Sequence, residues 1–183
     1  MNTTQPPTKL TVPMDKASFY SLVFALPITL ALAAFYATRW GAAALKLGFS
    51  QTTCSLPTFL VVLFGGVVMH EALHGLTWAF FGRKPLRTIK FGFQWKTLTP
   101  YAHSREPLEI NAYRLGTGMP GFVLGILPWL MALLTGTHWL AAFGLFFTLV
   151  AGGDMLILWL TRHVKAGRRV ADHPTEAGCS VLD

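Results

Sequence analysis

Two histidines and a glutamate lie inside an otherwise apolar stretch of the chain, Val61–Gly82. The pattern HEALH spans residues 70–74, and on a helix its two histidines, four residues apart, lie on the same face. Glu71 is rotated by about a quarter turn from His70 and can address a water bound to the same ion. Zn²⁺ with three protein ligands lowers the pKa of such a water, and a carboxylate can then act as general base. The pattern HExxH on a helix is therefore typical of metalloprotease chemistry.

The apolar surroundings strengthen this interpretation, because a charged side chain at the centre of a membrane helix costs roughly 2.5–3.5 kcal/mol on the mildest insertion scale. A lone histidine in such a place could be a satisfied core residue. Two histidines and a glutamate on one turn instead favour a binding site. Gly66 lies on the same helical face as His70 and His74, so we expect a neighbouring element to come close beside the ion.

A third metal ligand must come from another segment. Asp154, in "LVAGGDMLILWL", is the only other acidic residue inside a long apolar segment. It could instead serve helix packing or proton handling. A cation on the adjacent helix would offset the cost of burying the carboxylate, and Gly152 and Gly153 leave room for close helix contact. We therefore expect Asp154 to complete the site with His70 and His74.

The other histidines are weaker candidates. His103 and His173 lie in segments expected on the same side of the membrane as the site, and His103 is the first replacement if Asp154 is not a ligand. His138 is expected on the opposite side. His163 follows the last apolar segment, where a cation suits the helix dipole.

Composition indicates a membrane protein. Hydrophobic residues make up 52% of the 183-residue chain and charged residues only 13%, about half the usual charged share. A bilayer core requires roughly 20 apolar residues per helix. Four segments qualify, and they are approximately Phe19–Thr38, Pro57–Phe81, Leu115–Leu134 and Trp139–Thr161. The expected fold is an all-α polytopic membrane protein with about four transmembrane helices. Its divisions are a flexible N-terminus (1–18), one transmembrane metallopeptidase domain (19–161) and a C-terminal tail (162–183).

The first apolar segment has a second interpretation as a signal peptide, since "LALAAFYA" offers small residues for cleavage. Its polar leader of 18 residues and its long apolar run fit that role poorly. We favour a retained first helix.

The basic residues are distributed unevenly among the connecting segments. Only Arg39 and Lys46 lie between the first and second apolar segments. The other thirteen lie in segments of the opposite side, and they are Lys9, Lys16, Arg83, Lys84, Arg87, Lys90, Lys96, Arg105, Arg114, Arg162, Lys165, Arg168 and Arg169. The positive-inside rule then places both termini in the cytoplasm of a multi-pass inner-membrane protein. The excess of +7 is explained by topology and anionic lipid headgroups, and we expect no nucleic-acid partner.

The two cysteines fall on opposite sides of the membrane in this topology. Cys54 and Cys179 therefore cannot pair, and the sequence has no CxxC pattern. We expect both to be free thiols.

The connection between the second and third apolar segments carries a pattern of period two. In "IKFGFQWKTL", Ile89, Phe91, Phe93 and Trp95 alternate with polar residues or glycine, which indicates a strand with one aromatic face. A shorter alternation over residues 108–111 follows the turn-like "TPYAHSREP". We expect a small amphipathic β-hairpin at the membrane surface, with Phe91, Phe93 and Trp95 contacting substrate. The alternative is an interfacial loop whose aromatic residues anchor in headgroups.

These features together resemble the site-2 protease superfamily of intramembrane zinc metalloproteases. More closely, "HEALHGLTWAFFG", "AHSREPLEINAYRLGTGMP", "GGDM" and "DHPTEAG" are similar to segments of the small bacterial putative zincin peptidases. The resemblance covers about Pro57 to Val181. It implies zinc ligands at His70, His74 and Asp154 and a catalytic base at Glu71. The chain departs from site-2 proteases in having Gly153-Asp154-Met155 in place of Leu-Asp-Gly or Asn-x-Asp-Gly.

The sequence therefore predicts a membrane zinc metallopeptidase that hydrolyses peptide bonds of a membrane protein or peptide substrate. Zinc would polarise the scissile carbonyl, and Glu71 would serve as general base. The main rival is a non-catalytic membrane protein that binds a metal for structure or transport. A second rival is a membrane-embedded scaffold whose HExxH pattern is degenerate. Substrate identity and oligomeric state are left open.

Overall fold

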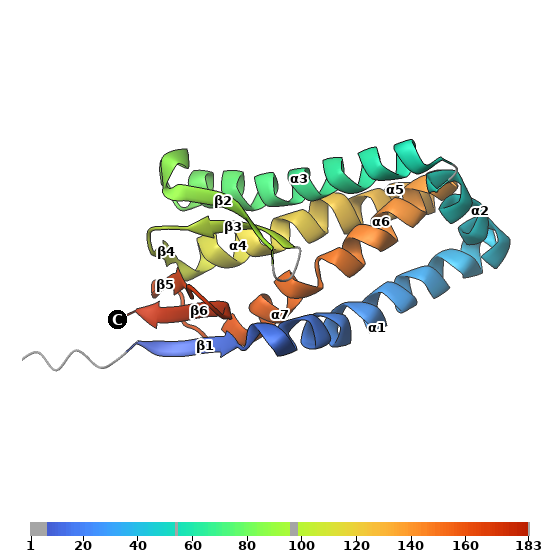
Figure 1. Ribbon diagram of the computed structural model, residues 1–183. Helices are drawn as coiled ribbons and strands as arrows, with labels where there is room; N and C mark the ends of the chain where they lie inside the picture. The colour runs from blue at the N-terminus through green and yellow to red at the C-terminus, as the bar shows by residue number, and fades with distance from the viewer. Residues whose placement is uncertain (1–6, 54, 96–98, 183) are drawn as a thin grey trace, which may run out of the picture.

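A computed structural model describes residues 7–53, 55–95 and 99–182, and Cys54 and Lys96 lie outside them. The chain is mostly helical, with two small antiparallel sheets at one end of a helix bundle (Figure 1). The long helices are α1 (Met14–Trp40) and α3 (Leu56–Phe81), and the shorter α2 (Ala42–Thr52) joins them. The second half contains α4 (Ile110–Pro120), η2 (Gly121–Ile126), α5 (Leu127–Thr135), α6 (His138–Val150) and α7 (Gly152–Thr161).

Among the described residues, three helices are long and apolar enough to cross a membrane, or up to four if one bent pair counts as a single span. The three are Met14–Trp40, Leu56–Phe81 and the composite helix Ile110–Thr135. The bent pair is α6 and α7, which meet at an angle of 47°. Each coincides with one of the four predicted apolar segments, although the last segment is broken rather than straight.

Helix α2 occupies a connection for which the sequence analysis expected no element. It lies at the end of the bundle opposite the sheets and packs beside α6 (Figure 1). Gly48 permits this approach, because a Cβ there would lie only 2.7 Å from the backbone carbonyl carbon of His138. Beside it, the Tyr36 hydroxyl is 3.0 Å from His138 Nδ1. His138 is thus at the end of the bundle away from the sheets.

The larger sheet has four strands in the order β1-β6-β5-β4. Their bounds are β1 Thr8–Val12, β4 Leu108–Glu109, β5 Arg169–Asp172 and β6 Ala177–Leu182. Strand β1 lies within the N-terminal segment that the sequence analysis treated as flexible, and it pairs with β6 from Thr8↔Val181 to Val12↔Ala177. The two ends of the described chain are therefore joined side by side.

The second sheet is the hairpin of β2 (Ile89–Gln94) and β3 (Thr99–Ser104), which follows the short turn η1 (Leu86–Thr88). Its register runs from Ile89↔Ser104 to Gln94↔Thr99. The predicted first strand is present, but the second alternation was assigned wrongly, because Leu108–Glu109 is β4 and pairs with β5. The partner strand of β2 is β3, which lies in the stretch "TPYAHSREP" that was expected to be a turn. Pro100 and Ser104 obscure its alternation of period two.

Glu109 begins α4 and ties it to the connection before β5. Its carboxylate accepts hydrogen bonds from the backbone of Asn111 (2.8 Å) and Ala112 (3.3 Å), as an N-cap does, and from Gly167 N (2.8 Å). Desolvation opposes the charged form, but these donors outweigh it and lower the pKa of Glu109. The start of α4 is thereby fixed beside the end of α7.

A buried cluster joins the helices to both sheets. It contains Trp78, Ile89, Leu108, Ile110, Tyr113, Val170, Cys179 and Val181. Because these residues come from α3, α4 and the four strands β2, β4, β5 and β6, the cluster fixes the sheets against the half of the bundle that carries the histidines.

Candidate metal centre

Helix α3 presents His70, His74 and Trp78 on one buried face, since each is four residues from the next. Its N-terminus is capped by Ser55, whose hydroxyl accepts from Thr58 N at 3.2 Å. Both histidines are 6% exposed. The helix therefore holds two imidazoles inside the protein at adjacent turns.

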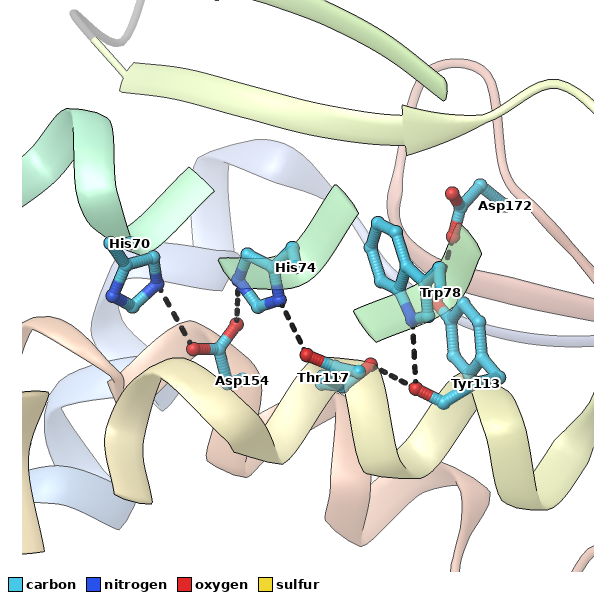
Figure 2. A network of polar contacts seen from close by, with 8 residues as sticks. His70, His74, Trp78, Tyr113, Thr117, Asp154 and Asp172 are labelled. Atoms are coloured by element: carbon cyan, nitrogen blue, oxygen red, sulfur yellow. Dashed lines mark hydrogen bonds and ion pairs between the residues drawn. The ribbon is translucent and has the colours of Figure 1, made fainter. Parts of the chain in front are cut away.

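Asp154 lies between these two imidazoles (Figure 2). Its Oδ2 is 3.2 Å from His70 Nε2, and its Oδ1 is 3.2 Å from His74 Nε2. The break between α6 and α7 makes this position possible, because Asp154 falls in the first turn of α7. Gly152 lets the break approach α1, where an added Cβ would lie 2.5 Å from the Ser21 carbonyl oxygen.

The protonation pattern of His74 indicates that a cation fits this cluster. His74 Nδ1 is 2.9 Å from the Gly116 carbonyl oxygen, which can only accept, so Nδ1 carries the hydrogen. In the neutral ring Nε2 then presents a lone pair toward the Asp154 carboxylate. Asp154 Oδ2 and His70 Nδ1 are also buried with no hydrogen-bond partner among the described residues. A metal ion among the three side chains would accept the facing lone pairs of His74 Nε2 and of the Asp154 carboxylate.

Glu71 is next to the same cluster but is held differently. One ligand atom from each of His70, Glu71 and His74 lies within 4.8 Å of the others, so Glu71 can reach a metal or a water beside it. A backbone hydrogen bond joins the Glu71 carboxylate to Ala102 of β3. The hairpin therefore orients the acidic side chain next to the two imidazoles.

A stack of rings supports His74 from behind (Figure 2). The Trp78 ring lies 5.2 Å from His74 at 18° and 5.8 Å from Tyr113 at 6°. Trp78 Nε1 donates to the Tyr113 carbonyl at 3.0 Å. Gly116 is required here, because a Cβ would overlap the Trp78 ring. The same short stretch of α4 thus receives the His74 hydrogen bond and admits the ring that stacks on it.

Asp172, at the end of β5, closes the network on the sheet side. Its carboxylate accepts from the Tyr113 hydroxyl at 2.8 Å and from Ser104 N at 3.0 Å, and His103 Nδ1 lies 3.4 Å away. Burial raises the pKa of Asp172, against the effect of these three donors. One carboxylate therefore links β5, β3 and α4 beside the metal centre.

A cavity of about 280 Å³ opens over the histidines and Asp154. Its hairpin wall is formed by Pro100, Tyr101 and Ala102 of β3, not by β2. None of the three aromatic residues predicted to contact substrate lines this cavity, and Phe93 lines a neighbouring cavity of about 740 Å³. Phe91 and Trp95 line neither of the two and are 51% and 78% exposed.

The remaining predicted histidines are also located. His103 and His173 line the neighbouring cavity and do not line the one over the metal centre. Sequence reasoning did not assign roles to Trp78, Tyr113 or Asp172. Trp78 continues the i, i+4, i+8 series of His70 and His74, which is a signal that could have found it. For Tyr113 and Asp172 the only signal was their place in segments similar to the zincin peptidases.

Two imidazoles, a carboxylate that bridges them and a second carboxylate beside them form a site of the metallopeptidase type. The chain belongs to the family described as "Putative zincin peptidase", which matches residues 63–168. The match includes His70, Glu71, His74 and Asp154 and ends before Asp172. Membership suggests metallopeptidase activity and implies zinc as the metal. No curated protein and no solved structure matches the chain.

Proposed function

We propose that the protein is an intramembrane zinc metallopeptidase with His70, His74 and Asp154 as ligands and Glu71 as general base. The observation that carries this proposal is the position of Asp154, 3.2 Å from the Nε2 atoms of both histidines. Two His and one carboxylate form a ligand set of catalytic zinc sites, which leave one position open. The apolar lengths of α3 and of Ile110–Thr135 support a site within the bilayer.

The chain's own residues supply the rest of the chemistry. Bound zinc would supply Lewis acidity toward the scissile carbonyl and toward the attacking water. Glu71 takes a proton from that water and returns it to the leaving amine. His74 keeps its Nε2 lone pair available, because Nδ1–H is engaged by the Gly116 carbonyl. The substrate lies extended in the cavity beside β3, where Ala102 holds Glu71 in position.

The test distinguishes residues that bind zinc from the residue that acts as general base. Glu71→Gln keeps the size of the side chain and removes its basicity, so it should retain about one zinc per chain. It should also lose roughly 10²–10⁴-fold in proteolysis of a membrane-embedded peptide. Asp154→Ala should lose both zinc and activity. His163→Ala is the matched control, because His163 is an exposed histidine outside the site, and it should change neither.

Elemental analysis and peptide cleavage by the purified variants give the outcome. Normal cleavage by Glu71→Gln would contradict the proposed mechanism. Full zinc occupancy without cleavage by any variant or by the wild type would favour a metal-binding or transport protein. Full zinc in Asp154→Ala would mean that another residue is the third ligand.

A further inference from the structure

A second cavity, of about 740 Å³, lies directly beside the one over the metal centre. The two share five lining residues, which are Tyr101, Ala102, Tyr113, Ile157 and Asp172. The second cavity is within the volume range of small-ligand sites. The two cavities are therefore adjacent, and a peptide over the metal centre would have the second cavity beside it.

The walls of the second cavity carry charge of both signs, but the acidic groups already have partners. Asp172 accepts from Tyr113 and Ser104, with His103 close by. Glu176 accepts from the Thr11 hydroxyl at 2.6 Å. Neither carboxylate needs a cationic ligand to satisfy it.

The basic groups are less engaged. Lys90 and His103 are paired neighbours across the hairpin and lie on one face of it, and Arg105 follows directly after the end of β3. Lys90 and Arg105 line the cavity and have no carboxylate partner among the described residues. His103 Nδ1 lies 3.4 Å from Asp172 Oδ2, and its Nε2 has no hydrogen-bond partner in the part of the chain that the structure describes.

His173 adds a donor from the opposite wall. Its Nδ1 accepts from Glu176 N at 3.1 Å, which leaves the hydrogen of the neutral ring on Nε2. The side chain is 11% exposed and lines the cavity. Two cations and a fixed N–H donor thus surround a space whose acidic groups are occupied, and this combination binds an anion.

We propose that the second cavity is a subsite for a carboxylate on the peptide whose scissile bond lies at the metal centre, recognised by Lys90, Arg105 and His173. The carboxylate is either an acidic side chain beside the cleavage site or the C-terminus of the peptide. This inference rests on the proposed function, because the peptide must reach the subsite from the metal centre.

The experiment measures peptide binding to the zinc-loaded Glu71→Gln protein in neutral detergent. The probes are four fluorescent peptides with one apolar half, whose polar half contains Glu or Gln and ends in a free acid or an amide. Either the peptides with Glu or the peptides with a free C-terminal acid should bind about tenfold more tightly than the peptide with Gln and a C-terminal amide. The form that binds more tightly identifies the source of the carboxylate. Lys90→Gln/Arg105→Gln should abolish that preference. Arg87→Gln/Lys165→Gln removes the same charge from exposed residues that line neither cavity, and it should keep the preference.

Equal affinity for all four peptides, or no binding of any, would overturn the subsite. The subsite would also be overturned if Lys90→Gln/Arg105→Gln kept the preference for the carboxylate and lost binding to phosphatidylglycerol vesicles. That result would assign the two residues to lipid headgroups. Cleavage of the Gln amide by zinc-loaded wild type tests the protease separately. A protease that cleaves all four peptides equally well keeps its proposed function and loses the subsite. Binding that depends on the carboxylate, without cleavage of any peptide, would support the subsite and contradict the proposed protease function.

Discussion

His74 is held on three sides in the candidate site, because its two ring nitrogens meet different helices and its ring face stacks on Trp78 of its own helix. Nε2 lies toward Asp154 of α7, Nδ1 meets the Gly116 carbonyl of α4, and the ring face lies on Trp78. Partners that orient a metal-binding histidine influence metal affinity, and their loss commonly costs 10–100-fold. The affinity of this site should therefore depend on residues that never touch the ion.

Gly116→Ala tests this dependence. The new methyl group would overlap the Trp78 ring, so Trp78 and His74 must shift, and zinc affinity should fall by at least about tenfold. Gly118→Ala is the control on the same helix, because its Cβ would meet Leu158 at an ordinary 3.6 Å. Competition titration with a zinc chelator measures both. Equal zinc affinities of the two variants would mean that the stack does not orient His74.

Cys179 provides a second prediction at a single residue. Burial first, then the Asp172 carboxylate, raises the pKa of its thiol to about 12. Since the thiolate is the reactive form, alkylation of the folded protein near pH 8 should be slower than that of a free thiol by on the order of a thousandfold. Mass spectrometry of a Cys54→Ser protein treated with N-ethylmaleimide measures this rate, and denatured protein is the reference. Rapid labelling in the folded state would contradict the buried position of β6.

Among the elements, α7 depends on α4 for its position. The Arg114 guanidinium donates to the carbonyl oxygens of Thr161 and Val164 at the end of α7, where the helix leaves carbonyls unsatisfied. Because Asp154 lies in the first turn of this ten-residue helix, a shift of α7 moves the carboxylate away from the histidines.

Arg114→Gln should therefore lower both stability and zinc affinity. The shorter, uncharged side chain cannot satisfy both carbonyls, and loss of hydrogen bonds to a charged group typically costs about 1.5–3 kcal/mol. Arg162→Gln is the matched control, since Arg162 is exposed and, among the described residues, contacts the backbone oxygen and the ring of Trp159 on its own helix. Thermal unfolding in detergent and zinc titration give the two readings. A destabilised Arg114 variant with wild-type zinc affinity would show that α7 keeps Asp154 in place without this contact.

The sequence alone located the elements with strong periodicity or length. HExxH identifies His70, Glu71 and His74 because their spacing is local to one helix, and Asp154 is conspicuous because an acidic residue is costly in an apolar segment. Strand β3 was missed, since Pro100 interrupts its alternation. Asp172 was missed because its partners, Tyr113 and Ser104, are distant in sequence and meet only in the folded chain. Local patterns carry no information about such contacts.

At the scale of the whole molecule, the hairpin and the larger sheet lie at one end of the bundle, and α2 lies at the other (Figure 1). This division agrees with the grouping of basic segments that predicts a cytoplasmic side. We propose that the sheet end faces the cytoplasm.

Labelling of intact cells tests the orientation. In a Cys54→Ser/Cys179→Ser background, a cysteine replacing exposed Lys46 in α2 should react with a membrane-impermeant maleimide. A cysteine replacing exposed Arg87, beside the hairpin, should react only after the membrane is permeabilised. Labelling of position 87 from outside would show that the orientation is the opposite of the proposed one. The geometry of the candidate metal centre would be unaffected by that result.

The pairing of β1 with β6 has a consequence for the order of assembly. Thr11 and Glu176 are separated by 165 positions, so β1 must wait for its partner until every helix described here has been synthesised. Asp172, at the end of β5, can contact Tyr113 and Ser104 only after α7 has been synthesised. Closing so long a loop is slow relative to local folding. A nascent chain therefore contains the two histidines, the hairpin and Asp154 before Asp172 can join them, and the four-stranded sheet is complete only after β6 has been synthesised.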